Sequence, residues 1–435
     1  MSDTKQIAPL KLILEGRFWD SHVYMGKLYL FTIDGRVHTI EWDRLISEFP
    51  LPDELALPMQ CAFSRSDYLY ENRHDPLHQD PQVRELIQAK FMRLANHHKI
   101  PRAADWRKYL VHTKDSPFPF PHLDATIYMK GVFAVSEQGV FVISNNDLQS
   151  KSKSKRGKSG RALQMWDCPV LSVDASYGSL ALAAGPEGLF EFELDDWVRG
   201  DPRKAKQVDP GDCSDCSWAY YSIMGSSQKQ GGIFAEYVAR GNGDGADVNQ
   251  GRRASKGKNK GPKEFEPTNL GRSWREAPKI ERRFEKARSL KDIFNFNPSG
   301  SGSASGYCWG GMDKICHASE GTMTVAQYSP WKDEPERLRV LRRLTFDSQK
   351  GSPIGGAVAP FGSIIEMDKY IVVVRSDDEI FTIPGAPVNW RVFNRSKQYE
   401  NQLHVIHENR LEIYSFNHDY FVDQKQKFSG ISAFV

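Results

Sequence analysis

The sequence predicts an all-β fold, and three observations support this prediction. Residues 131–144 read GVFAVSEQGVFVIS, two apolar segments around a short polar turn that contains a glycine. Alternation of apolar residues on both sides of such a turn is typical of a β-hairpin. The same strand–turn–strand shape returns along the chain at irregular intervals. Most of these hairpins are also preceded by one more strand-like segment of four to six residues.

The composition is that of an ordinary globular protein. The chain has 435 residues, of which 40% are hydrophobic and 26% are charged. The first sixteen residues lack the apolar run of a signal peptide, and no stretch approaches the ~18 apolar residues of a membrane span. Six cysteines are too few for a disulfide scaffold, so we expect reduced thiols. We therefore expect a cytoplasmic protein without a membrane partner.

The first part of the chain predicts strands followed by an insert. Residues 11–42 give three or four antiparallel strands, with Asp34-Gly35 as a strong hairpin signal. Residues 43–121 interrupt the β pattern. Within this insert one amphipathic helix is predicted, because apolar residues recur at helical spacing after Pro81. These residues are Val83, Leu86, Ile87, Phe91 and Leu94.

The middle of the chain alternates strands with two basic segments. Strands are predicted over 125–144, 162–197 and 217–237. The loop 145–161 contains SKSKSKRGKSGR, a low-complexity run that cannot bury a core. The segment 239–306 is rich in Gly, Asn, Lys and Arg, and we expect it to be a mostly disordered basic insertion. The helical spacing of Ile280, Phe284, Ala287 and Leu290 predicts one short helix inside it.

The remainder of the chain returns to strands, over 307–328, 337–346, 355–393 and 402–421. Aligned on their central hairpins, the units have about four short strands each, and neighbouring units lie 40–50 residues apart where no insertion intervenes. Such a repeat is the sequence signature of a β-propeller. We predict a single six- or seven-bladed β-propeller domain over 1–435, with 431–435 closing the ring. The alternative is a two-domain β-sandwich protein divided at 239–306.

Three Trp-Asp pairs add a family resemblance. Trp19-Asp20, Trp42-Asp43 and Trp166-Asp167 are similar to the dipeptide that closes a WD40 blade, although the companion Gly-His pair is missing. The chain therefore resembles WD40 propellers in architecture but matches no specific family. This resemblance implies that the loops at the ends of the ring bind other protein subunits.

The two basic runs are the first candidate binding site. They carry Lys and Arg without acidic residues, so they could neutralise phosphates of RNA or DNA, or bind an acidic partner. The alternative is that they are solvated loops. The candidate residues are Lys151, Lys153, Lys155, Arg156, Lys158, Arg161, Arg252, Arg253, Lys256, Lys258 and Lys260.

Cys213 and Cys216 are the second candidate site. Their C-x2-C spacing supplies two of the four ligands of a structural zinc, and Cys308 with Cys316 or His317 could supply the others. The interpretation we favour is a pair of ordinary thiols, so we expect no cofactor.

The sequence contains no nucleotide-binding loop and no nucleophile elbow, and it predicts no catalytic residue. The leading hypothesis is a non-enzymatic scaffold or recognition subunit of a larger assembly, which could be a ribonucleoprotein. One alternative is a nucleic-acid-binding module that acts through the basic runs. Another is a hydrolase or lyase whose residues converge in the propeller channel from different blades.

Overall fold

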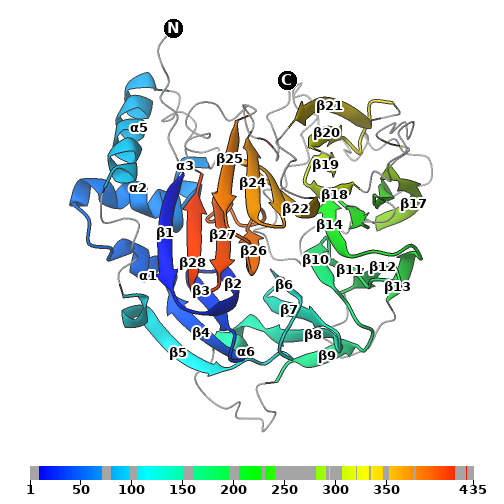
Figure 1. The fold of residues 1–435 in the computed structure, drawn as a ribbon, viewed down its shortest axis with the longest axis horizontal. Helices are drawn as coiled ribbons and strands as arrows, with labels where there is room; N and C mark the ends of the chain where they lie inside the picture. The colour runs from blue at the N-terminus through cyan, green and yellow to red at the C-terminus, as the bar shows by residue number, and fades with distance from the viewer. Residues whose placement is uncertain are drawn as a thin grey trace, which may run out of the picture.

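Seven four-stranded antiparallel sheets surround a common centre in the computed structural model (Figure 1). The structure describes residues 9–70, 80–97, 105–149, 161–194, 205–227, 231–240, 281–290, 293, 306–319, 321–332, 335–345, 352–375, 379–416 and 428. Neighbouring innermost strands contact one another around much of the ring. The protein is thus a β-propeller, as predicted, and it has seven blades.

Each blade runs from an innermost to an outermost strand. In this order the strands are β2 (Phe18–Tyr24), β3 (Lys27–Thr32), β4 (Arg36–Glu41) and β5 (Leu110–Asp115) in blade 1; β6 (Asp124–Tyr128), β7 (Gly131–Ser136), β8 (Gly139–Ser144) and β9 (Leu163–Trp166) in blade 2; β10 (Ser172–Ser176), β11 (Ser179–Ala183), β12 (Leu189–Glu193) and β13 (Lys206–Asp209) in blade 3; β14 (Asp215–Ala219), β15 (Ser222–Ser226), β16 (Ile233–Arg240) and β17 (Glu281–Ser289) in blade 4. The remaining strands are β18 (Tyr307–Gly311), β19 (Lys314–Ser319), β20 (Thr322–Tyr328) and β21 (Leu338–Thr345) in blade 5; β22 (Pro353–Ala359), β23 (Gly362–Met367), β24 (Tyr370–Arg375) and β25 (Ile380–Pro384) in blade 6; β26 (Asn389–Val392), β27 (Gln402–His407), β28 (Arg410–Ser415) and β1 (Leu10–Glu15) in blade 7.

The ring is closed by the N-terminal strand. β1 pairs antiparallel with β28 from Leu10↔Ser415 to Glu15↔Arg410, so the last blade contains strands from both ends of the chain. This pairing covers the edge that β28 would otherwise expose. The segment 431–435, which the sequence predicts as the closing strand, lies outside the described residues.

The blades pack through apolar side chains on both faces, and the hairpin β7–β8 shows how. Phe133 and Val135 pack toward blade 3 in one buried cluster, whereas Val132 and Ala134 pack toward blade 1 in another. Successive strand residues point to opposite faces, so a strand between two neighbours must be apolar throughout. All six residues of β7 are accordingly buried.

Helices fill the connection between β4 and β5. They are α1 (Trp42–Ser47), α2 (Asp53–Phe63), α3 (Asp67–Tyr70), α5 (Pro81–Ala95) and the 3-10 helix η2 (Trp106–Tyr109). α5 is the predicted amphipathic helix, and Phe91 and Leu94 bury its apolar face in a cluster that includes α2 residues. The range 43–121 therefore holds more helices than the one expected, and it also contains β5, the fourth strand of blade 1.

The prediction of a short helix within 239–306 is wrong. Residues Glu281–Ser289 form β17, which pairs with β16 from Arg240↔Glu281 to Ile233↔Ser289. Exposure along the second half of this strand alternates, with Phe284 and Lys286 half-buried and Glu285 and Ala287 exposed. The apolar residues of a short segment can fit both the helical and the strand period. Here pairing with the otherwise open edge of β16 favours the strand. Most of the insertion lies outside the described residues, as does most of the loop 145–161, whose first part forms α6 (Asn145–Gln149). Among the described residues, no helix has the length and apolar character needed to cross a membrane.

Candidate functional site

The innermost strands carry a ring of residues at one level of the channel. In blades 1 to 6 the innermost strand ends at a tight turn into the second strand, and the residue four positions before that end is structurally equivalent in each. Asn389 begins the innermost strand of blade 7. We call these residues the inner ring: Asp20, Asp124, Ser172, Asp215, Tyr307, Gly355 and Asn389.

The turns that follow the innermost strands of blades 1 to 3 have positive φ angles at both central residues. The two central residues of the β2–β3 turn, Met25 and Gly26, have φ of 48° and 74°, and Met129 and Lys130 in the β6–β7 turn have 48° and 65°. Two consecutive positive φ values define a type I′ turn, whose twist matches that of a hairpin. Tyr177 and Gly178 repeat this geometry in the β10–β11 turn, with φ of 49° and 75°, so the turn is shared by blades 1 to 3.

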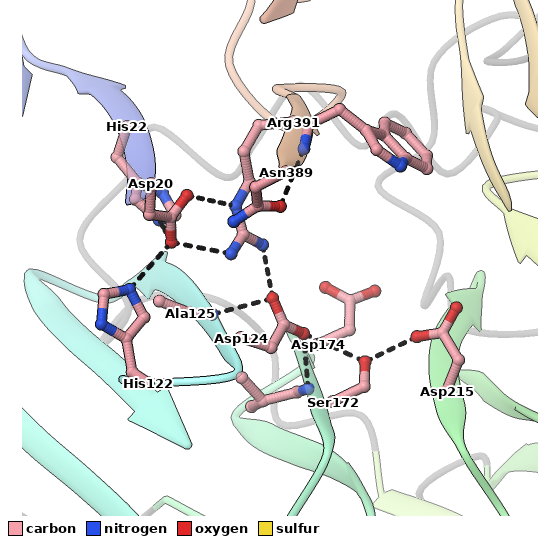
Figure 2. Close-up of polar contacts among 12 residues, drawn as sticks. Asp20, His22, His122, Asp124, Ala125, Ser172, Asp174, Asp215, Asn389 and Arg391 are labelled. Atoms are coloured by element: carbon pink, nitrogen blue, oxygen red, sulfur yellow. Dashed lines mark hydrogen bonds and ion pairs between the residues drawn. The ribbon is translucent and has the colours of Figure 1, made fainter. Parts of the chain in front are cut away.

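Local hydrogen bonds orient the acidic members of the inner ring. The carboxylates of Asp20, Asp124 and Asp215 each accept the backbone N–H of the following residue at 2.8 Å. The side chain of Asn389 accepts the N–H of Trp390 at the same distance. Figure 2 shows these side chains directed toward one another from different strands.

Arg391 of β26 joins the two ends of the ring. Its Nε and Nη2 each lie 2.8 Å from a carboxylate oxygen of Asp20, and its Nη1 binds Asp124 (Figure 2). The imidazoles of His22 and His122 lie 3.2 and 3.1 Å from the same Asp20 carboxylate. Burial would raise the pKa of Asp20, but the charge of Arg391 and the contacts with both histidines hold it well below its usual range.

A hydroxyl bridge continues the network to the opposite side. Ser172 Oγ lies 3.0 Å from Asp124 Oδ2 and 2.6 Å from Asp215 Oδ1, and Tyr307 donates its hydroxyl to Asp215 Oδ2 at 2.6 Å. One hydroxyl has one proton, so Ser172 can donate to only one of these two carboxyl groups at a time. Burial raises the pKa of Asp215, and the neighbouring charge of Asp124 adds to this increase.

Glu366 adds a fourth carboxylate, from the second strand of blade 6. It pairs with Gly355, where a Cβ would lie 2.6 Å from Glu366 Oε2, so glycine at this ring position leaves room for the carboxylate. Trp390 Nε1 donates to the same oxygen at 2.7 Å. Burial raises the pKa of Glu366, and the charge of Asp215 acts in the same direction. Within the described part of the chain, Glu366 and Asp215 form no ion pair.

Asp174, in the innermost strand of blade 3, is paired with a cation. Arg395 Nη2 lies 3.0 Å from Asp174 Oδ1, and both side chains are partly exposed. The backbone N–H of Trp218 also donates to Asp174 at 3.2 Å. Among the described residues of this network, two arginines face five carboxylates, and both arginines form ion pairs.

Of the basic residues predicted to bind nucleic acid, only Arg161 is described, and its side chain is exposed. The remaining ten residues lie outside the described residues: Lys151, Lys153, Lys155, Arg156, Lys158, Arg252, Arg253, Lys256, Lys258 and Lys260.

Cys213 and Cys216 are buried thiols in the core between blades 3 and 4. Cys213 Sγ donates to the Asp215 carbonyl at 3.3 Å, and Cys216 Sγ donates to the Ala181 carbonyl at 3.2 Å. Burial raises the pKa of both thiols, which disfavours the thiolate that zinc requires. Cys308 pairs with His317 in blade 5 and belongs to a different buried cluster. Across the described ranges, no three His, Cys, Asp or Glu side chains gather as a metal site.

The sequence prediction did not include the inner ring, although a signal for part of it exists. Asp20 and Asp124 both begin a D-x3-Y-M pattern, DSHVYM and DATIYM, which spans the innermost strand and the first turn residue. The three Trp-Asp pairs, in contrast, lie in different elements: Trp19 in β2, Trp42 in α1 and Trp166 in β9.

No protein-family model matches the chain, and no curated protein matches it. Among solved structures, the chain is similar to the computationally designed Ika8 protein, with 7% identity over 94% of this chain and 100% of that one and a TM-score of 0.44. It is also similar to the WD40 domain of Pan2 from Neurospora crassa, with 8% identity over 95% of this chain and 97% of that one and a TM-score of 0.44. The strand pairing of the chain itself defines its class. The protein is a seven-bladed β-propeller.

Proposed function

We propose that this propeller is a non-enzymatic recognition or scaffold subunit that binds protein partners at one mouth of its channel. The observation that carries the proposal is a set of apolar side chains directly before the inner-ring positions. We call this set the apolar collar: Trp19, Leu123, Leu171, Ile354 and Val388. Of the two remaining positions, blade 4 has Ser214 and blade 5 has Gly306.

Four of the five collar residues are exposed, and Trp19 is partly buried. Leu123, Leu171, Ile354 and Val388 are between 37% and 43% exposed. Two collar members, Trp19 and Ile354, sit at irregularities of strand register, and such bulges re-aim a side chain. Apolar side chains clustered at an end face, rimmed by polar groups, are typical of a protein interaction site.

The chemistry of the inner ring favours binding over catalysis. Ser172 lies against two carboxylates, so among the described ring residues it has no imidazole to act as its base. Asp20 is fully buried beneath Arg391 and cannot reach a substrate. A cytoplasmic location and binding of RNA or DNA by the basic runs stay predictions from the sequence.

A differential capture experiment tests the proposal. The full-length protein is compared with a collar variant, Leu123→Ser/Leu171→Ser/Val388→Ser, and with a matched variant of exposed apolar residues on outermost strands, Leu163→Ser/Ile380→Ser. Quantitative mass spectrometry of proteins captured from the native cell extract should show a set retained by the wild type and the matched variant and lost by the collar variant. Capture of the same set by all three folded proteins would contradict the proposal.

A further inference from the structure

The C-terminal segment returns to the propeller after the last blade is complete. β28 ends at Ser415, and each of the seven blades has its four strands without any later residue. Phe428 is nevertheless only 3% exposed, and it belongs to the buried cluster between blades 5 and 6. Its backbone N–H donates to the Pro360 carbonyl at 2.9 Å. A side chain that the sheets do not require therefore fills a space between two blades.

The two described residues after Ser415 lie on opposite faces of the same turn. This turn, Pro360–Phe361, joins β22 to β23 in blade 6. Phe416 stacks on Phe361 with ring centroids 4.5 Å apart and an interplanar angle of 6°, in the cluster shared with blade 7. Phe428 lies on the blade 5 side and binds Pro360. Residues 417–427 therefore connect two points that are close together.

Blade 5 places a cation at the edge of the space that Phe428 fills. The guanidinium of Arg342 lies over the Phe428 ring, 5.4 Å from its centroid, where the ring electrons attract it. β21 shifts register at Leu341, which has no partner on β20, and such a bulge re-aims the residues beside it. Arg342 Nη2 also donates to the Arg375 carbonyl of blade 6 at 3.3 Å. This second contact holds the guanidinium across the gap between the blades.

We call this space the interblade pocket: the apolar cluster shared by blades 5 and 6, with Arg342 and the Pro360 carbonyl at its edge. Blades 5 and 6 supply every member of that cluster except Phe428. An apolar pocket with a few polar groups at its edge is typical of a site that binds one anchor residue of a peptide. The pocket therefore has the composition of a binding site, and Phe428 is its occupant.

We propose that the interblade pocket is a recognition site for a phenylalanine side chain of an extended segment in a protein partner, and that the C-terminal segment of this chain occupies it as an intramolecular competitor. The occupant defines the ligand. An aromatic ring suits the apolar cluster and Arg342, and the backbone N–H of the same residue suits the Pro360 carbonyl. Pro360 follows the innermost strand of blade 6, whereas the collar precedes these strands, so the inference goes beyond the proposed function and does not depend on it.

The short connection gives Phe428 an advantage over a phenylalanine on a separate molecule. Since residues 417–427 join two points on one turn, closing this loop costs little entropy, and the effective concentration of Phe428 is on the order of millimolar. A partner segment displaces Phe428 only when it binds more tightly than this, through contacts beyond the one phenylalanine. The C-terminal segment thus sets a threshold that excludes weak ligands.

Fluorine NMR with a peptide from the chain itself tests the inference. The probe is a capped peptide with the sequence of residues 424–432, QKQKFSGIS, in which 4-fluorophenylalanine replaces the phenylalanine. The full-length Phe428→Ala variant has a vacated pocket and should bind the probe. The wild type should bind it at least about 5-fold more weakly, because its own Phe428 competes. Phe434→Ala removes another phenylalanine of the same segment and is the matched control, which should behave as the wild type does.

Changes in the ligand and in the pocket define the chemistry of recognition. An unlabelled peptide with phenylalanine should displace the probe from Phe428→Ala, and a peptide with alanine should not. Cyclohexylalanine keeps the apolar volume but lacks the aromatic face, so that peptide should bind about 3-fold more weakly. Adding Arg342→Leu to Phe428→Ala should weaken probe binding by a similar factor, whereas Arg339→Leu, exposed on the same strand, should not. Thermal denaturation shows that each variant is folded.

Three results would overturn the inference. If folded Phe428→Ala does not bind the probe, the pocket accepts only the tethered segment. If the wild type and Phe428→Ala bind the probe equally, the probe binds elsewhere and Phe428 is no competitor. If sedimentation shows a dimer of the wild type that Phe428→Ala does not form, the pocket holds the C-terminal segment of a second copy. The capture experiment on the collar variant is unaffected by all three.

Discussion

Arg391 and Asp20 lie near opposite ends of the sequence and form a two-point ion pair at the centre of the propeller (Figure 2). Asp20 belongs to the innermost strand of blade 1, and Arg391 belongs to the innermost strand of blade 7. The ring is therefore joined twice where the chain ends meet, by β1–β28 pairing toward the outside and by this ion pair at the channel. Each of these two contacts can be tested by its own substitution.

Replacement of Arg391 by leucine should lower the free energy of unfolding by about 3–5 kcal/mol, because it leaves the fully buried carboxylate of Asp20 without its cation. Urea unfolding followed by tryptophan fluorescence measures the change. The control is Arg395→Leu, which removes a partly exposed ion pair with Asp174 and should cost about 1 kcal/mol or less. Equal losses in the two variants would show that the Arg391–Asp20 pair does not stabilise the ring.

Replacement of Leu12 by alanine tests closure by β1. Leu12 is fully buried on the strand that pairs with β28, so the variant should lose about 2–5 kcal/mol of stability in the same assay. Ile13→Ala removes the same apolar carbons from the adjacent, half-buried position of the strand and should cost clearly less. The assignment of β1 to blade 7 would be wrong if Ile13→Ala were the more damaging change.

The stability of the protein should fall as the pH falls below about 6.5, and His404 is one reason. Burial lowers the pKa of His404 to about 3, and its ring nitrogens lie 3.0 Å from Ser21 Oγ and 3.2 Å from Gln402 Oε1. Between the unfolded pKa of about 6.5 and the folded value, the unfolded chain binds a proton that the folded chain does not, so unfolding is favoured as the pH drops.

The measurement is the free energy of unfolding at several pH values between 7 and 4.5. His404→Gln should reduce the slope by up to about 1.4 kcal/mol per pH unit, because glutamine does not titrate. His317→Gln should act with the same sign over a window that ends near pH 4, since burial lowers the pKa of His317 to about 4. Identical slopes in the wild type and His404→Gln would contradict this account.

The hairpins could be predicted from the sequence because each is encoded locally. In β7–β8 the apolar alternation and the glycine turn lie within fourteen consecutive residues. The packing of both strands in the core agrees with this local preference. β17 shows the limit of this approach. A helical period fits the apolar residues Ile280, Phe284, Ala287 and Leu290. The segment forms a strand because it pairs with the edge of β16, and this tertiary contact cannot be seen in the sequence.

The inner ring could not be predicted for a different reason. Each blade contributes about one polar residue, and a single aspartate at a strand start is more simply interpreted as a turn residue. The role of these aspartates becomes visible only in the folded ring, where Asp20 and Asp124 both contact Arg391. The repeated D-x3-Y-M pattern marks the positions but not their partner, because Arg391 comes from a blade without the pattern.

The pairing of β1 with β28 also sets an order of events during synthesis. Leu10 leaves the ribosome long before its partner Ser415, and at about 5–20 residues per second the interval is roughly 20–80 s. During that time the alternating apolar face of β1, with Leu10, Leu12 and Leu14, has no sheet to join. A nascent chain in this state exposes an unpaired strand edge, which can pair with other nascent chains until β28 is made.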